Sequence, residues 1–178
     1  SRQTNRRETI DSRLILVVIL LALSLPITAV MAIPSGSEEL TVLSTEFESS
    51  GGPLQIEAGG RSQIQSTIEN SQPFPIVVIL QPQTDGIHYS QQVLRVRPGE
   101  TAETQVTISA PEEVGSHVRA RSEHHYVYLL PATVIEALHN IHPFVAVVGV
   151  NSVILMPLAV LFYLFFGFRQ ITVRDTTR

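Results

Sequence analysis

Two long runs of uncharged residues lie toward the two ends of the chain. They are Leu14–Ile33 and Val145–Phe168, and neither contains an acidic or basic side chain. At 1.5 Å per residue, about 20 helical residues cross the roughly 30 Å hydrocarbon core of a bilayer. Pro26 and Pro157 lie inside the runs and are expected to kink the helices rather than end them. The pattern predicts two transmembrane helices, over 14–33 and 144–168.

The first run has a second interpretation, as a cleavable secretory signal. Val30-Met31-Ala32 resembles the small-residue cleavage site of such a signal. The run is longer than the roughly 7–15 apolar residues usual in signal peptides. A retained span is therefore favoured, and cleavage of the first span stays open.

Between the two runs, residues 34–128 alternate between apolar and polar positions. Ile64–Glu69 and Ala102–Ile108 show a period of two, which is typical of half-buried strands. Ile76–Leu80 is apolar throughout and is expected to be a central strand buried on both faces. The expected strands, separated by turn-forming residues, are 40–47, 54–58, 62–69, 75–81, 87–97, 101–108 and 116–128. This spacing predicts a mainly β fold, an immunoglobulin-like antiparallel β-sandwich flanked by two transmembrane α-helices.

The segment 129–143 changes to a helical pattern. Pro131 suits the first turn of a helix and Pro143 its end. Apolar residues recur at helical spacing between them: Val134, Ile135, Leu138 and Ile141. We expect an interfacial amphipathic helix on the outer membrane surface.

The distribution of basic residues predicts the topology. All twelve basic side chains are arginine, and several lie beyond the outer ends of the two apolar runs, for example Arg13 and Arg169. The positive-inside rule therefore places the leader 1–13 and the tail 169–178 in the cytoplasm and 34–128 outside the cell membrane. The net charge of −4 argues against a nucleic-acid partner, and the predicted partner is the lipid bilayer.

Composition excludes several kinds of site. The chain has no cysteine, which excludes disulfides, thiolate nucleophiles and cysteine-based metal sites. It has no lysine, which excludes a lysine base or Schiff base. No phosphate-binding glycine loop or paired-carboxylate motif occurs in the sequence, and we predict no cofactor and no catalytic residue.

Four arginines are the candidate binding residues. They occupy alternate positions on two expected strands, and they would form one basic stripe if those strands paired: Arg95, Arg97, Arg119 and Arg121. Such a stripe would suit anionic headgroups or a carboxylate-rich partner. The alternative is that each arginine forms cross-strand ion pairs with the many glutamates of the domain.

Asn151 is the candidate contact inside the second span. Its amide could hydrogen-bond to the first span or to another subunit, with about 1 kcal/mol at stake.

The histidines are candidate metal ligands. His139 and His142 are three apart and would share a helix face, but a zinc site needs a third ligand such as Glu136 or Glu123. We interpret the histidines as amphipathic side chains of the headgroup zone and predict no metal site. Ser116-His117 lacks a nucleophile-elbow glycine pattern, so we do not interpret it as a hydrolase site.

Taken together, many short stretches resemble the C-terminal region of haloarchaeal type I signal peptidases. The block before the second span is the most specific of them. The stretches are Ile10–Arg13, Ile33–Gly36, Val42–Phe47, Ile56–Gly60, Leu80–Pro82, Asp85–Ile87, Val106–Gly115, Glu123–Tyr126, Leu129–Pro131, Val134–Leu138 and Ile141–Pro143.

The resemblance implies a role in cutting signal peptides from exported proteins. Those enzymes are membrane serine endopeptidases whose catalytic serine and histidine lie upstream of the region resembled here. It implies an accessory outer domain, with an upstream catalytic domain (in the same or a separate chain) and exported preproteins as partners. Whether the chain is a piece of such a protease stays open. A stand-alone membrane-tethered binding or structural module is the alternative, and an independent enzyme or metal site is the least favoured hypothesis.

Overall fold

The computed structural model describes residues 8–47, 52, 54–167 and 170–173. These form two compact units, a helical unit (residues 1–28 and 151–178) and a sheet unit (residues 29–150). Parts of the expected leader (1–7) and tail (169 and 174–178), the last residue of the expected second span (168), and residues 48–51 and 53 of the expected sandwich lie outside the described residues. The fold is mixed α/β, with two larger sheets and three helices among the described residues, so the expected class of mainly β is too narrow.

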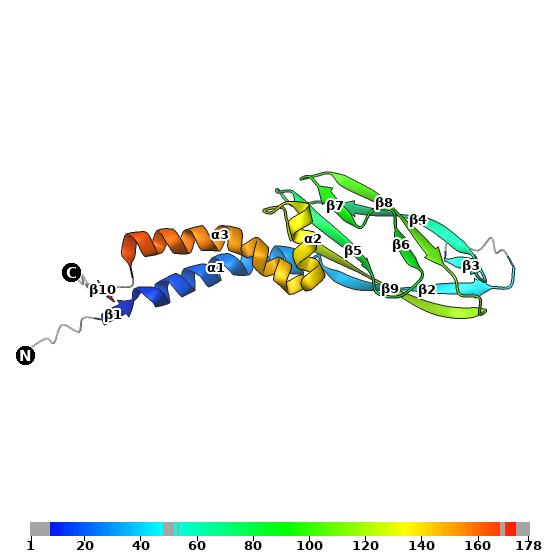
Figure 1. Ribbon diagram of the computed structural model, residues 1–178, viewed down its shortest axis with the longest axis horizontal. Coiled ribbons are helices and arrows are strands. Elements are labelled where there is room, and N and C mark those ends of the chain that lie inside the picture. Colours follow the sequence, from blue (N-terminus) through cyan, green and yellow to red (C-terminus); the bar gives the residue numbers. More distant parts are fainter. Residues whose placement is uncertain (1–7, 48–51, 53, 168–169, 174–178) are drawn as a thin grey trace, which may run out of the picture. The chain divides into compact units, whose positions relative to one another are not determined.

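Two helices are long and apolar enough to cross a membrane. They are α1 (Ser12–Ala32, 21 residues) and α3 (Pro143–Phe166, 24 residues). Pro26 and Pro157 both lie inside helix, as expected. In the helical unit, α1 and α3 run side by side (Figure 1), and Asn151 Nδ2 donates a hydrogen bond to Thr28 Oγ1 at 3.2 Å.

A short strand ladder at the ends of these helices was not expected from the sequence. Strand β1 (Glu8–Asp11) pairs antiparallel with β10 (Gln170–Val173). Beside it, Ser12 Oγ donates to Gly167 O at 3.1 Å, and Gly167 adopts a positive φ of 56°. A polar four-residue strand leaves too little periodicity in the sequence to be recognised.

The larger sheet of the sheet unit has five strands in the order β3-β2-β9-β5-β7. Its pairs are antiparallel except β2 with β3, which is parallel. The strands are β2 (Gly36–Thr45), β3 (Gln55–Glu57), β5 (Ile76–Pro82), β7 (Val93–Val96) and β9 (Gly115–Val127). Strand β5 is flanked on both sides and its residues 76–80 are buried, which confirms the expected central strand.

The smaller sheet has three antiparallel strands in the order β4-β8-β6. They are β4 (Arg61–Glu69), β6 (Ile87–Tyr89) and β8 (Thr101–Ser109). The prediction of one strand over 87–97 was wrong, because β6 and β7 belong to different sheets. The chain crosses between the sheets at Ser90-Gln91, where Thr104 Oγ1 donates to Gln91 O at 3.0 Å and accepts from Gln91 N at 3.2 Å.

The two sheets pack face to face over two apolar clusters. One cluster joins both sheets around β2, β6 and β8 and contains Val42, Ile56, Ile87, Val106, Ile108 and Ala110. The other joins β4 to β5 and β7 and contains Ile68, Ile76, Val78, Leu80, Leu94 and Val96. The clusters supply the apolar burial that holds the unit together, since the chain has no disulfide.

Asn70 joins two loops at one end of the sheets. Its side chain is 1% exposed, and Nδ2 donates to Phe74 O at 2.9 Å and to Val96 O at 3.1 Å. Its Oδ1 accepts from Gln72 N at 3.0 Å. One amide therefore fixes both the turn before β5 and the end of β7.

Candidate functional site: helix α2 and the polar face of strand β9

Helix α2 (Ala132–Ile141) packs against β5 and β7 on the outer face of the larger sheet (Figure 1). Ile135 is fully buried, as is Val77 of β5, whose side chain points to that face. Next along the chain, α3 begins at Pro143, and Gly149 in its second turn lies against Leu138. A Cβ at Gly149 would lie 2.5 Å from Leu138 Cδ1, so glycine allows this close approach.

A buried hydrogen-bonded group holds α2 to the sheet. Tyr126 of β9 and His139 of α2 are 2% and 4% exposed, and Tyr126 Oη lies 2.7 Å from His139 Nδ1. His139 Nε2 lies 3.2 Å from Gln81 Oε1, on β5. These two distances fit a neutral imidazole. Its Nδ1 accepts a hydrogen bond from the tyrosine hydroxyl, and its Nε2–H donates one to the amide oxygen of Gln81. Helix, β9 and β5 thus meet at one side chain.

Burial sets the protonation state of this group. Burial raises the pKa of Tyr126 to about 12, which keeps the phenol protonated. Burial, and then the nearby His124 and His142, lower the pKa of His139. Burial and His125 also lower the pKa of His124, whose ring centroid lies 4.8 Å from that of His139. At neutral pH these histidines are therefore uncharged.

One histidine, His139, differs from the sequence-based interpretation. His139 is a buried structural residue and not an amphipathic side chain of the headgroup zone. His142 ends α2, is exposed, and accepts a hydrogen bond from Phe144 N at 3.1 Å. Among the residues that the structure describes, no three histidine or carboxylate side chains are arranged to hold a metal ion.

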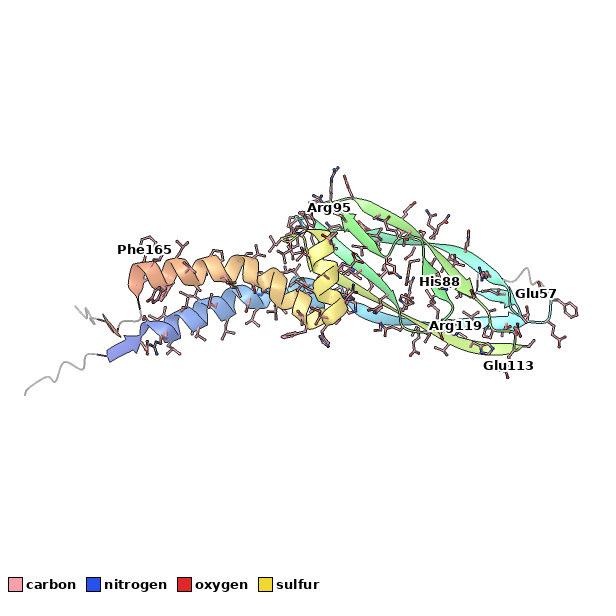
Figure 2. All side chains as sticks on the ribbon, viewed as in Figure 1. Glu57, His88, Arg95, Glu113, Arg119 and Phe165 are labelled. Carbon is pink, nitrogen blue, oxygen red and sulfur yellow. The ribbon has the colours of Figure 1, made fainter. Side chains whose placement is uncertain are left out.

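The four candidate arginines do not form one stripe. Strand β5 lies between β7 and β9, so the pairing on which the stripe depended does not occur. Arg95 is opposite Val77, on the outer face of the sheet. Arg119 and Arg121 are opposite Leu40 and Glu38 of β2, on the inner face that carries Val42. Figure 2 shows Arg95 and Arg119 far apart along the sheet.

Each arginine has its own surroundings. Arg95 lies over the ring of Tyr128, with Cζ 4.1 Å from the centroid, and Arg97 lies 3.6 Å from Glu100 in an exposed pair. Arg121 donates from Nε to Glu38 Oε2 at 2.8 Å, and Nη2 bonds to the same oxygen. Arg119 Nη2 is 3.4 Å from Ser109 O. The cross-strand ion pair considered as the alternative describes Arg121.

The inner face of β9 is polar, which the sequence did not reveal. Its side chains lie between the two apolar clusters: His117, Arg119, Arg121, Glu123 and His125. Besides the Arg121–Glu38 pair, Glu123 Oε1 bonds to His125 Nε2, and His125 is 8% exposed. Tyr89 reaches this face from β6; burial raises its pKa, and Arg121 partly offsets that effect. Arg121 and Glu38 form an ion pair across β2 and β9, whereas Arg119 reaches only the backbone oxygen of Ser109.

Comparison with known proteins does not place the chain in a family. No protein-family profile and no curated protein matches it. Among solved structures, the crystal structure of a FixG-related protein from Vibrio parahaemolyticus is similar over 55% of this chain and 98% of that chain. The identity is 13% and the TM-score is 0.31, too distant a likeness to assign a fold family or function.

Proposed function

We propose that this chain holds an immunoglobulin-like accessory domain on the outer face of the cell membrane, where it supports the cleavage of signal peptides from exported proteins. The observation that carries the anchoring is the order of elements. A sheet unit with its own apolar core lies in sequence between two helices of 21 and 24 residues, each long and apolar enough to cross a membrane. Arginines beyond the outer ends of these helices support cytoplasmic termini.

The link to signal-peptide cleavage rests on the resemblance to the C-terminal region of haloarchaeal signal peptidases. The structure supports an accessory role in one respect. Inside the sheet unit, Arg121 is paired with Glu38, His125 with Glu123, and His139 is held by Tyr126 and Gln81. We assign the domain the role of positioning the catalytic domain or the preprotein, and the chemistry to the serine and histidine of a partner domain.

The test begins with the native protein. An antibody to residues 34–128 is used to isolate it from the membranes of its source cells, and its mass and N-terminal sequence are measured. A product that continues upstream of Ser1 into a serine–histidine peptidase domain supports the proposal. A product that starts near Ser1 and isolates without a peptidase contradicts it and favours the stand-alone tethered module.

A second experiment tests the activity directly. Cells that produce the protein without residues 34–128 are pulse-labelled, and processing of an exported preprotein is followed. We expect the precursor to accumulate, while the full chain restores processing. Normal processing in the deletion strain would exclude a supporting role.

The topology is tested separately. Protease added outside intact cells should cut within 34–128 and leave the termini intact; cleavage of either terminus would overturn the topology.

A further inference from the structure

Helix α2 has more apolar surface than the sheet unit covers. Ile135 and His139 face the sheet, and Leu138 packs on Gly149. A second apolar stripe, Val134, Ala137 and Ile141, is exposed; its members are three and four residues apart and so share one side of the helix. Val134 and Ile141 are 41% and 72% exposed. The polar side chains Thr133, Glu136 and Asn140 occupy the remaining side.

The exposed stripe continues into the start of α3. Ile141 lies two residues before Pro143, the first residue of that uncharged helix, and Phe144 is 65% exposed. At the other end of α2, Leu129 is 37% exposed. An exposed apolar stripe that leads directly into a membrane-length helix has the chemistry of a surface covered by lipid.

A cation accompanies the stripe. Arg95 is exposed on β7, and β7 is one of the two strands against which α2 packs. Tyr128 lies four residues before α2, and its ring packs against the flat face of the Arg95 guanidinium, with Cζ 4.1 Å from the ring centroid. The N–H groups at the edge of the guanidinium remain directed outward, toward an acceptor. A phosphate oxygen of an anionic headgroup is such an acceptor.

We propose that the stripe of Val134, Ala137 and Ile141, together with Phe144, lies at the headgroup–acyl boundary of the membrane that α3 enters, with Arg95 bound to anionic headgroups. The proposal rests on the membrane anchoring proposed above. Because Tyr126, His139 and Gln81 fix the opposite side of α2 to the sheet, lipid contact along the stripe would fix how the sheet unit is presented at the surface.

The chain has no cysteine, so single labelling sites can be introduced without background. The full chain is placed in lipid nanodiscs containing phosphatidylglycerol, and an environment-sensitive fluorophore is attached to Ile141→Cys. The matched control is Asn140→Cys, its neighbour on the polar side. Val118→Cys, on an exposed position of β9, reports the aqueous reference. Ile154→Cys, within α3, reports the bilayer.

Lipids that carry a nitroxide just below the headgroup are the quencher. We expect the label at 141 to lose most of its emission, the label at 140 to lose much less, and the label at 118 to be unchanged. Equal quenching at 141 and 118 would overturn the inference. If the label at 154 is then strongly quenched by lipids that carry the nitroxide deeper in the acyl chain, the anchoring stays intact. Absence of quenching at 154 as well would overturn the anchoring itself.

The role of Arg95 is tested in the same system. We expect Arg95→Gln to reduce quenching at 141 in nanodiscs with phosphatidylglycerol and to have no effect in purely zwitterionic ones. The matched control is Arg97→Gln, since Arg97 already pairs with Glu100. An equal effect of both substitutions, or none from Arg95→Gln in anionic lipid, would refute the headgroup contact.

Discussion

The hydrogen bond between Tyr126 and His139 offers the sharpest test of how α2 is held. Tyr126→Phe keeps the ring, which is 2% exposed, and removes only the hydroxyl 2.7 Å from His139 Nδ1. A neutral hydrogen bond contributes about 1 kcal/mol net, and a buried acceptor left without a donor costs about 1–3 kcal/mol. We therefore expect Tyr126→Phe to destabilise the sheet unit by about 1.5–3 kcal/mol.

The assay combines two measurements on the full chain in detergent micelles. Thermal unfolding followed by circular dichroism gives the global loss, about 3–6 °C per kcal/mol for a unit of this size. Hydrogen exchange of peptides from 129–142 gives the free energy of local opening, which should fall by a similar amount if α2 opens first. Tyr128→Phe is the matched control, since it also removes one phenol hydroxyl; Tyr128 is only half-buried, and we expect this change to cost less than about 0.5 kcal/mol.

A double-mutant cycle with His139→Leu separates the hydrogen bond from general packing. The double variant replaces both buried polar partners by apolar groups, so it should cost clearly less than the two single changes added together, by about 1 kcal/mol or more. Additivity within about 0.5 kcal/mol would refute the reasoning, because it would mean that the two groups do not interact energetically.

Three further predictions follow from described contacts. His139 and His124 have lowered pKa values in the folded chain, so the unfolded chain binds more protons below about pH 6.5. The free energy of unfolding should therefore be highest above that pH and should fall as pH decreases, by at most about 1.4 kcal/mol per pH unit for His139. His139→Leu should make this dependence on pH less steep. Equal pH dependence in both proteins would contradict the prediction. Asn70→Ala removes the three hydrogen bonds of a buried amide and should destabilise the sheet unit by about 3 kcal/mol, measured by chemical denaturation; a loss below about 1 kcal/mol would count against the role of Asn70. A chain with Thr28→Cys and Asn151→Cys should form an intramolecular disulfide on mild oxidation, seen as a mobility shift that neither single variant shows; failure to crosslink would place the two helices apart.

The sequence predicted those features that depend on one segment alone. The length of an uncharged apolar run can be read from its own segment. The helices α1 and α3 accordingly begin and end within two residues of the expected spans. Residues 76–80 carry no polar side chain, and β5 is accordingly buried on both faces. Period two located the individual strands β4 and β8 in the same way.

Features that depend on strand order could not be read from one segment. Alternation shows that Arg95 and Arg121 are on strands but not that β5 separates those strands or that the two side chains face opposite ways. The polar inner face of β9 likewise depends on other strands, since Arg121 is paired there with Glu38 of β2. The burial of His139 depends on Tyr126, which reaches it from another element, so its own segment does not reveal it. The one signal in the sequence was its position one turn after Ile135 on the same face of α2.

The pairing of β2 with β9 has a mechanical consequence. Strand β2 starts four residues after α1, and β9 is the last strand before α2 and α3. The ladder between β2 and β9 runs from Gly36 opposite Glu123 to Ser44 opposite Gly115. Tension on α1 would enter β2 at Gly36 and would open the ladder from that end, one residue pair at a time. A pull along the strands instead would load all of these backbone bonds together. A sideways pull on α1 would thus be the direction in which this ladder yields most easily, and a pull on α1 along β2 the direction that it resists.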